Sequence, residues 1–135
     1  MDASPTFWLP DESRNFDDIN ALCVGTGRFL RSVLVPALVN IDYKPCLIQT
    51  RGRSFIEYMF KNSSGTYEVD TVQSSGQITT TNIPCYGAFS LGRPQDKQEF
   101  VTRLVSKITN QDHRNPRITI VGIGVTEKGL SSKDT

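Results

Sequence analysis

The 135-residue sequence predicts one α/β domain with a mainly parallel sheet, and three observations predict it. Short, nearly unbroken apolar runs alternate with helical patterns, which is typical of parallel strands buried on both faces. A glycine-rich turn joins the first apolar run to the first helical pattern. The length allows one domain with its own core but no second full-sized domain.

The first half of the chain has the pattern of a βαβ unit. An apolar run at residues 19–24 precedes the turn Gly25-Thr26-Gly27, a helical pattern at residues 28–39 and a second apolar run at residues 45–50. Because proline lacks the N–H that a helix needs, Pro36 predicts a kink or an irregular turn. The two strands should be parallel, with a right-handed crossover.

The second half departs from this repeat. A short helix is expected at residues 54–60 with Ser54 as its N-cap, followed by a β-hairpin or meander at residues 66–89. Residues 94–110 predict a longer helix, and residues 117–125 a third strand of the buried type. The longer helix should pack through one apolar face, made of Phe100, Val101, Leu104, Val105 and Ile108.

Together these elements predict a Rossmann-like, three-layer α/β domain with a mainly parallel sheet and an inserted β-hairpin. We expect this domain to span residues 18–130. Residues 1–17 read as a flexible or loosely docked arm and residues 131–135 as a disordered tail, because both are polar and lack periodic apolar positions.

Composition excludes several kinds of partner. The 15 Lys and Arg residues nearly balance 14 Asp and Glu, and a net charge of +1 provides no basic surface for nucleic acid or an anionic membrane. No stretch approaches the roughly 18 apolar residues of a membrane span, and no secretory signal pattern begins the chain. Cys23, Cys46 and Cys85 are isolated and are expected to be buried free thiols. We therefore expect a cytoplasmic protein without nucleic-acid or membrane partners.

The glycine turn is the strongest candidate for a ligand site. At a strand-to-helix junction, the helix N-terminus presents unpaired N–H groups and the positive end of the helix dipole. Gly25 permits the sharp turn and Gly27 lets a pyrophosphate approach the backbone, although Leu30 replaces the usual third glycine. The turn therefore predicts a nucleotide phosphate site, with a tight turn that binds no ligand as the alternative.

The end of the second predicted strand bears on the choice of nucleotide. Folds that prefer NAD place an acid about 20 residues after the glycines to hold the ribose hydroxyls. Residues 49–54 contain no acid, whereas Arg51, Arg53 and Ser54 could hold a 2′-phosphate. We expect NADP or NAD, with a slight preference for NADP; a solvated basic loop is the alternative.

With these segments in place, the sequence resembles the mannitol dehydrogenase family, the long-chain polyol and hexuronate dehydrogenases that include tagaturonate and fructuronate reductases. The resemblance covers roughly residues 19–130 and implies a Rossmann-type NAD(P)-binding domain. Family members pass hydride between a nicotinamide and a secondary alcohol or ketone, without a metal. Three segments carry the resemblance: Gly25-Thr26-Gly27-Arg28-Phe29-Leu30-Arg31, Gln49-Thr50-Arg51-Gly52 and Thr126-Glu127-Lys128-Gly129.

The resemblance also implies roles for individual residues. Thr126 and Glu127 match a pair at the nicotinamide end, where Glu127 could orient a polar group or relay a proton; a surface carboxylate beside Lys128 is the alternative. The remaining cofactor residues fall into two groups. The phosphate turn holds Gly25, Thr26, Gly27, Arg28, Phe29 and Arg31, and the ribose loop holds Gln49, Thr50, Arg51 and Arg53.

One family feature is missing from the sequence. The family's acid/base lysine belongs to a K-x4-N-x2-H pattern in a helical C-terminal domain, and no lysine here has Asn five positions later. Asn110 and His113 satisfy only the second part, because Val105 occupies the lysine position. We expect the catalytic half to be absent, so that this chain binds the dinucleotide but is inactive alone. A sugar alcohol or uronate would bind only with a catalytic domain supplied.

Two other functions stay open on the sequence. The first is a non-catalytic nucleotide-binding or interaction module of the same fold, which could self-associate through the surface that a catalytic domain would cover. The second is a methyltransferase that uses S-adenosylmethionine, whose first loop is also glycine-rich. The missing acid after the second strand and the inserted hairpin both count against the methyltransferase.

Overall fold

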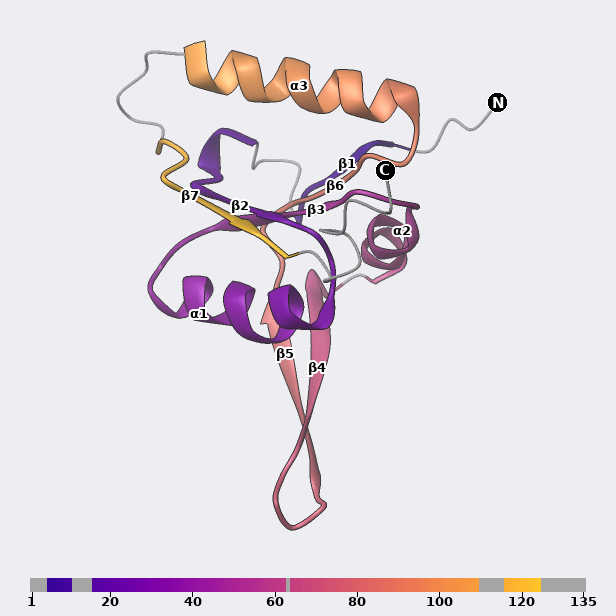
Figure 1. The fold of residues 1–135 in the computed structure, drawn as a ribbon, viewed down its shortest axis with the longest axis vertical. Coiled ribbons are helices and arrows are strands. Elements are labelled where there is room, and N and C mark those ends of the chain that lie inside the picture. Colours follow the sequence, from indigo (N-terminus) through magenta and orange to yellow (C-terminus); the bar gives the residue numbers. More distant parts are fainter. Residues whose placement is uncertain (1–4, 11–15, 63, 110–115, 125–135) are drawn as a thin grey trace, which may run out of the picture.

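The structure, a computed structural model, describes residues 5–10, 16–62, 64–109 and 116–124. Its centre is a five-stranded sheet in the order β1-β6-β3-β2-β7 (Figure 1). The strands β6, β3, β2 and β7 run parallel to one another, and β1 pairs antiparallel with β6. The strands are β1 (Phe7–Trp8), β2 (Ala21–Val24), β3 (Pro45–Gln49), β6 (Ala88–Ser90) and β7 (Ile120–Ile123).

Helices cover both faces of this sheet (Figure 1). On one face lie η2 (Leu30–Leu34), α1 (Val35–Asn40) and α2 (Ser54–Lys61), and on the other face lies α3 (Pro94–Thr109). Alternate side chains of β2 enter two separate buried clusters: Cys23 packs toward α1 and α2, and Leu22 packs toward α3. The predicted α/β class and mainly parallel sheet are confirmed, and the arrangement is compatible with a Rossmann-like fold.

The inserted hairpin is confirmed as a two-stranded arm that projects from the body (Figure 1). It consists of β4 (Thr66–Val72) and β5 (Ile78–Pro84), paired antiparallel over their full length. At its base, Tyr67 lies opposite Ile83, and both side chains are buried against α2 and the sheet. The outer part of the arm is exposed, so only the base anchors it to the core.

The helix after the glycine turn is irregular before Pro36, as predicted. Residues 30–34 form a π-helical turn, in which the N–H of Val35 donates to the carbonyl oxygen of Leu30. This turn changes which side chains face the core: Leu30, Val35 and Leu38 are buried, whereas Phe29 and Val33 are exposed. The spacing of Phe29, Leu30, Val33, Leu34, Ala37 and Leu38 predicts one apolar face of a regular helix. This prediction is wrong in part, because a π turn rotates the positions that follow it.

The start of the chain is attached more closely than the sequence suggested. Phe7 and Trp8 form the edge strand β1, and Phe16 lies in the buried cluster beneath α3. The ring of Phe7 stacks on that of Phe89 at 4.3 Å between centroids. The described part of the predicted loose arm is thus docked, because its few aromatic residues reach a core formed far along the chain.

The last strand and helix differ from the prediction in exposure. β7 lies at the edge of the sheet, with Val121 and Ile123 more than half exposed, so it is not the buried strand expected. In α3, Phe100 and Leu104 pack against the core, but Val101, Val105 and Ile108 are exposed. Within the described residues, no strand pairs with the outer edge of β7.

Two further findings concern the whole described chain. Cys23, Cys46 and Cys85 are buried free thiols, as expected, and burial raises the pKa of Cys23 to about 11. Within residues 5–10, 16–62, 64–109 and 116–124, no helix has the length and apolar character to cross a membrane.

Candidate functional site

The glycine turn lies where β2 ends, beside the ends of both neighbouring strands. The N–H of Gly25 donates to the carbonyl oxygen of Ile48 in β3 at 2.7 Å. Gly25 has φ +121°, and a Cβ there would lie 2.6 Å from the carbonyl oxygen of Gly124 after β7. Both the backbone conformation and the space therefore require glycine at this position.

Gly27 is different, because the chain's own packing does not require it. A Cβ at Gly27 would have no other atom within 4 Å. The helical hydrogen bonds begin here, with the N–H of Arg31 donating to the carbonyl oxygen of Gly27 at 3.1 Å. The backbone of Gly27 is thus open to an approaching group at the start of a helix, where anions bind favourably.

A second pair of glycines, Gly122 and Gly124, lies beside the glycine turn, and sequence reasoning missed it. We call the space above the turn at these strand ends the crevice. A Cβ at Gly122 would overlap the side chain of Leu34, and one at Gly124 would lie 2.7 Å from Cγ of Leu30. These glycines let η2 pack closely on the sheet. The spacing Gly122-x-Gly124 in the last strand is the signal that could have revealed them.

This crevice also lies where the strand order reverses. The chain proceeds from β2 to β3 and β6 on one side, then returns to place β7 on the other side of β2. In open α/β sheets, ligands bind at the carboxyl ends of the strands at such a point. The glycine turn therefore occupies the position in the fold where a ligand site is expected.

The loop after β3 does not present all its predicted residues to a ligand. Gln49 is buried: its Oε1 accepts from the N–H of Phe55 at 2.9 Å, and its Nε2 donates to Oγ of Ser54 at 3.1 Å. Gln49 therefore caps α2, and Ser54 is the first residue of the helix and not the N-cap expected. Thr50 and Arg51 are exposed.

Arg53 is engaged with a buried carboxylate. Its Nη1 lies 3.3 Å from Oδ2 of Asp96, and its Nη2 donates to the carbonyl oxygen of Pro5. Asp96 is fully buried and also accepts from Oγ1 of Thr6 at 2.6 Å and from Nη2 of Arg93 at 2.7 Å. Arg53 thus joins the start of the chain to the start of α3, and is directed away from the role expected for it.

The electrostatics of Asp96 fit this structural role. Burial would raise the pKa of the Asp96 carboxyl, but hydrogen bonds from Arg93 and Thr6 outweigh burial and hold the pKa below its usual value. The N–H of Arg93 also donates to Oδ2 of Asp96 at 2.9 Å, which caps the first turn of α3.

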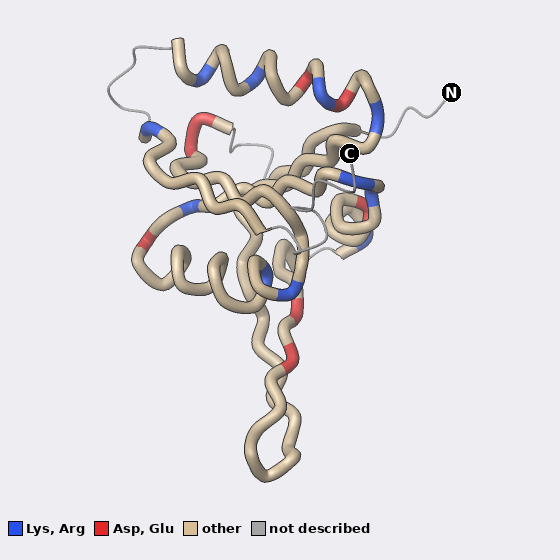
Figure 2. The backbone as a smooth tube through the Cα atoms, viewed as in Figure 1, with Lys and Arg blue, Asp and Glu red and all other residues tan. Residues whose placement is uncertain are grey.

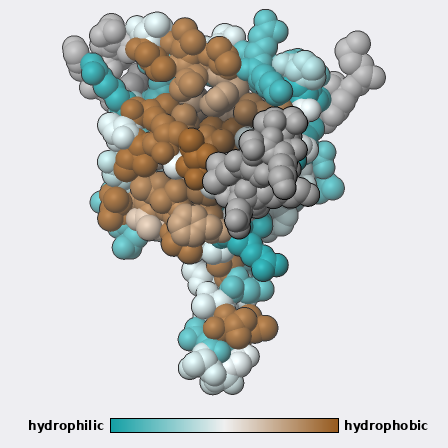
Figure 3. All heavy atoms as spheres, in the orientation of Figure 1, coloured by the Kyte–Doolittle hydropathy of each residue, from teal (hydrophilic) through white to brown (hydrophobic). Residues whose placement is uncertain are grey.

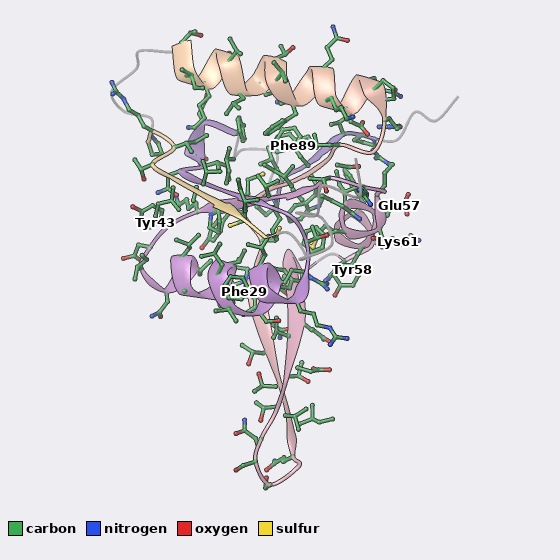
Figure 4. The ribbon with its side chains drawn as sticks, in the orientation of Figure 1. Phe29, Tyr43, Glu57, Tyr58, Lys61 and Phe89 are labelled. Carbon is green, nitrogen blue, oxygen red and sulfur yellow. The ribbon has the colours of Figure 1, made fainter. Side chains whose placement is uncertain are left out.

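The cationic residues of the turn lie around its open side. Arg28 is exposed, and Phe29 is 62% exposed and points outward (Figure 4). Arg31 is half-buried, and its Nε is buried without a hydrogen-bond partner in the described part of the chain. An unpaired buried donor of this kind is costly unless a ligand or water completes it.

A cavity of about 450 Å³, here called the turn cavity, lies beside the glycine turn. It is open to solvent and is bordered by the turn, η2, the start of α2 and the base of the hairpin. Tyr58 projects from α2 toward the hairpin base (Figure 4). Sequence reasoning missed its hairpin side, because spacing along the chain did not show where the hairpin would pack. The lining residues are Thr26, Arg31, Ser54, Phe55, Tyr58, Tyr67, Glu68 and Asp70.

Thr126 and Glu127 lie outside the described residues. No group of three or more His, Cys, Asp and Glu side chains in the described ranges is arranged to hold a metal ion. Comparison with protein-family models, curated proteins and solved structures finds no match.

Proposed function

We propose that this chain is a Rossmann-like domain that binds NAD or NADP, with the pyrophosphate over Gly25-Thr26-Gly27. The observation that carries the proposal is the contrast between two glycines. Glycine is required at Gly25 by the fold. At Gly27 packing does not require glycine, and its absence of a side chain leaves the backbone at the helix start accessible. Close approach of a phosphate to the backbone explains a glycine at such a position.

We further propose that the domain serves an oxidoreductase that interconverts a polyol or hexuronate secondary alcohol and its ketone. The reaction class rests on the resemblance to the mannitol dehydrogenase family. We expect this chain by itself to bind the dinucleotide without turnover, because the K-x4-N-x2-H pattern does not occur in it. Sugar substrate would then bind only when a catalytic domain is supplied.

Titration with NADH and NADPH, followed by nucleotide fluorescence, tests the binding proposal. We expect saturable binding by the wild type and its loss in Gly27→Phe, whose ring would occupy the phosphate position. Gly27→Ala is the matched control and should weaken binding less. Because a Cβ at Gly27 meets no neighbour, Gly27→Ala should unfold at the wild-type temperature, and thermal unfolding of Gly27→Phe checks that its loss of binding is not a loss of fold.

Two results would contradict the proposal. One is the absence of saturable binding of either nucleotide at millimolar concentration. The other is wild-type affinity in Gly27→Phe, which would show that nucleotide binding does not depend on the accessible backbone of Gly27.

The alternative of a non-catalytic interaction module is favoured by one observation, the apolar outer side of β7. Val121 is 56% and Ile123 67% exposed, and both lie on the same face of the edge strand. Figure 3 shows apolar side chains gathered over α3, β7 and α1. Apolar patches of this kind mark surfaces that associate with other protein surfaces.

A further inference from the structure

We propose that the turn cavity binds the ribose beside the adenine as an unphosphorylated diol, and that Glu68 of the hairpin accepts its hydroxyls. This inference rests on the proposed dinucleotide binding and adds the residue that decides between NAD and NADP. It replaces the slight preference for NADP that the loop after β3 predicted.

The position of the cavity supports this assignment. Thr26 contributes from the turn after β2 and Ser54 from the segment after β3, and these strands are parallel neighbours. In dinucleotide-binding α/β folds, the ribose next to the pyrophosphate lies between these two strand ends. A pyrophosphate at the glycine turn therefore brings its adjoining ribose to this cavity.

In the loop that was expected to hold a 2′-phosphate, Arg53 and Ser54 are engaged in other contacts. Arg53 is bound to Asp96, and Oγ of Ser54 accepts from Gln49. Of the two arginines of this loop, Arg51 is exposed and Arg53 is only partly so. A 2′-phosphate would thus find one cation of the expected pair in the loop.

The charges lining the cavity oppose a phosphate. Arg31 is the one cation among its lining residues, against two carboxylates, Glu68 and Asp70. Figure 2 shows the same character along the hairpin, whose charged residues are all acidic. A phosphate monoester carries about two negative charges near neutral pH and would be repelled, whereas a neutral diol can donate to a carboxylate.

Of the two carboxylates, Glu68 is the better acceptor. Oδ1 of Asp70 accepts from Oγ1 of Thr80 across the hairpin at 2.7 Å. Glu68 is exposed, and within the described residues nothing donates to its carboxylate. Arg28 and Arg31 line a second opening of about 400 Å³ together with Glu68 and Asp70.

Arg31 adds a reason for a ligand oxygen in the cavity. Its Nε is buried and lacks a partner in the described chain. A ribose or phosphate oxygen beside Thr26 would supply an acceptor. The cavity thus offers a donor from η2 and an acceptor from the hairpin, which suits a sugar that can both accept and donate hydrogen bonds.

The experiment measures Kd for NADH and NADPH in the wild type, Glu68→Gln and Glu57→Gln. Glu57 is exposed on α2 outside the cavity, so its variant matches the loss of charge without the contact (Figure 4). We expect the wild type to prefer NADH, and Glu68→Gln to weaken NADH about tenfold relative to NADPH, the scale of one charge-assisted hydrogen bond. Glu57→Gln should keep the wild-type ratio.

The outcomes separate this inference from the proposed function. A wild type that prefers NADPH, or a ratio unchanged in Glu68→Gln, overturns the role of Glu68 while dinucleotide binding stands. An equal shift in Glu57→Gln also overturns it, because net charge and not contact would then be responsible. If neither nucleotide binds to the wild type, the proposed function fails as well.

Discussion

At the scale of single residues, Asp96 is the most consequential side chain outside the site. It is fully buried and holds Arg53 and Arg93 from two different segments, together with the hydroxyl of Thr6. Removing one member of a buried ion pair leaves the other charge uncompensated, which costs more than the pair contributes. The start of the chain, the loop after β3 and the start of α3 all depend on this carboxylate.

We therefore predict that Asp96→Ala lowers the free energy of unfolding by about 3 kcal/mol, measured by urea denaturation. Arg53→Ala should also destabilise the fold, whereas Arg51→Ala should not, because Arg51 is exposed. Equal stability of the two arginine variants would contradict the structural role given to Arg53.

The ionisation of Asp96 should make the free energy of unfolding depend on pH. Its pKa is lower in the folded state than the roughly 3.9 of an unfolded aspartate, so folding is favoured when it is ionised. The stabilisation is complete above the unfolded pKa and is lost as pH falls through the folded pKa. Acid unfolding below about pH 4 should therefore be less steep in Asp96→Asn than in the wild type.

At the scale of elements, the hairpin supports the helix that follows the glycine turn. The hydroxyl of Tyr67 donates to the carbonyl oxygen of Arg31 at 2.8 Å. In the π-helical register that carbonyl faces Pro36, which has no N–H to give, and the N–H of Val35 is used by Leu30. Tyr67 therefore supplies the hydrogen bond that proline withholds.

We predict that Tyr67→Phe lowers the free energy of unfolding by about 1–2 kcal/mol, because it leaves a half-buried carbonyl without its donor. The phenyl ring would keep its edge contact with Phe55. Tyr43→Phe is the control, since among the described residues its hydroxyl takes part only in an exposed contact of 3.4 Å with Thr119. Equal losses in the two variants in thermal or urea unfolding would count against this account.

At the scale of the whole molecule, the exposed edge strand β7 is where we expect association with another chain. An edge strand with unpaired backbone groups and apolar side chains is a template for pairing with another chain. Ile108 of α3 is also exposed and lines a mainly apolar groove of about 530 Å³ with Leu22 and Val121. The lining of this groove also includes Lys107 and Arg117.

We expect the wild type to self-associate with rising concentration in light scattering or sedimentation, and Val121→Lys with Ile123→Lys to remain monomeric. A lysine on an edge strand opposes pairing because its charge would be buried in the new contact. Val72→Lys, at the exposed hairpin tip, is the matched control and should associate like the wild type. A monomeric wild type at all concentrations would refute the interaction surface.

Much of the fold could be predicted because the relevant signals are local. The apolar run before Gly25 and the one after Pro45 each identify a buried strand, and the alternation from Thr66 to Val72 identifies a hairpin strand. The glycine turn was located for the same reason. A residue's periodic neighbours are within a few positions, so spacing along the chain reports them.

What the sequence by itself determined, then, is the strands β2, β3 and β7, the hairpin, the helices along the chain and the strand-to-helix turn that a phosphate would approach. It did not predict that β1 and β6 join the central sheet. Only the tertiary structure decided that Asp96 binds Arg53 from 43 positions away, that Gln49 caps α2 and that Glu68 lines the turn cavity. The physical reason is that a side chain's role depends on which partner lies within contact distance of it in the folded chain. For Arg53 that partner is a buried carboxylate, and for the cavity it is a hairpin whose packing no local pattern specifies.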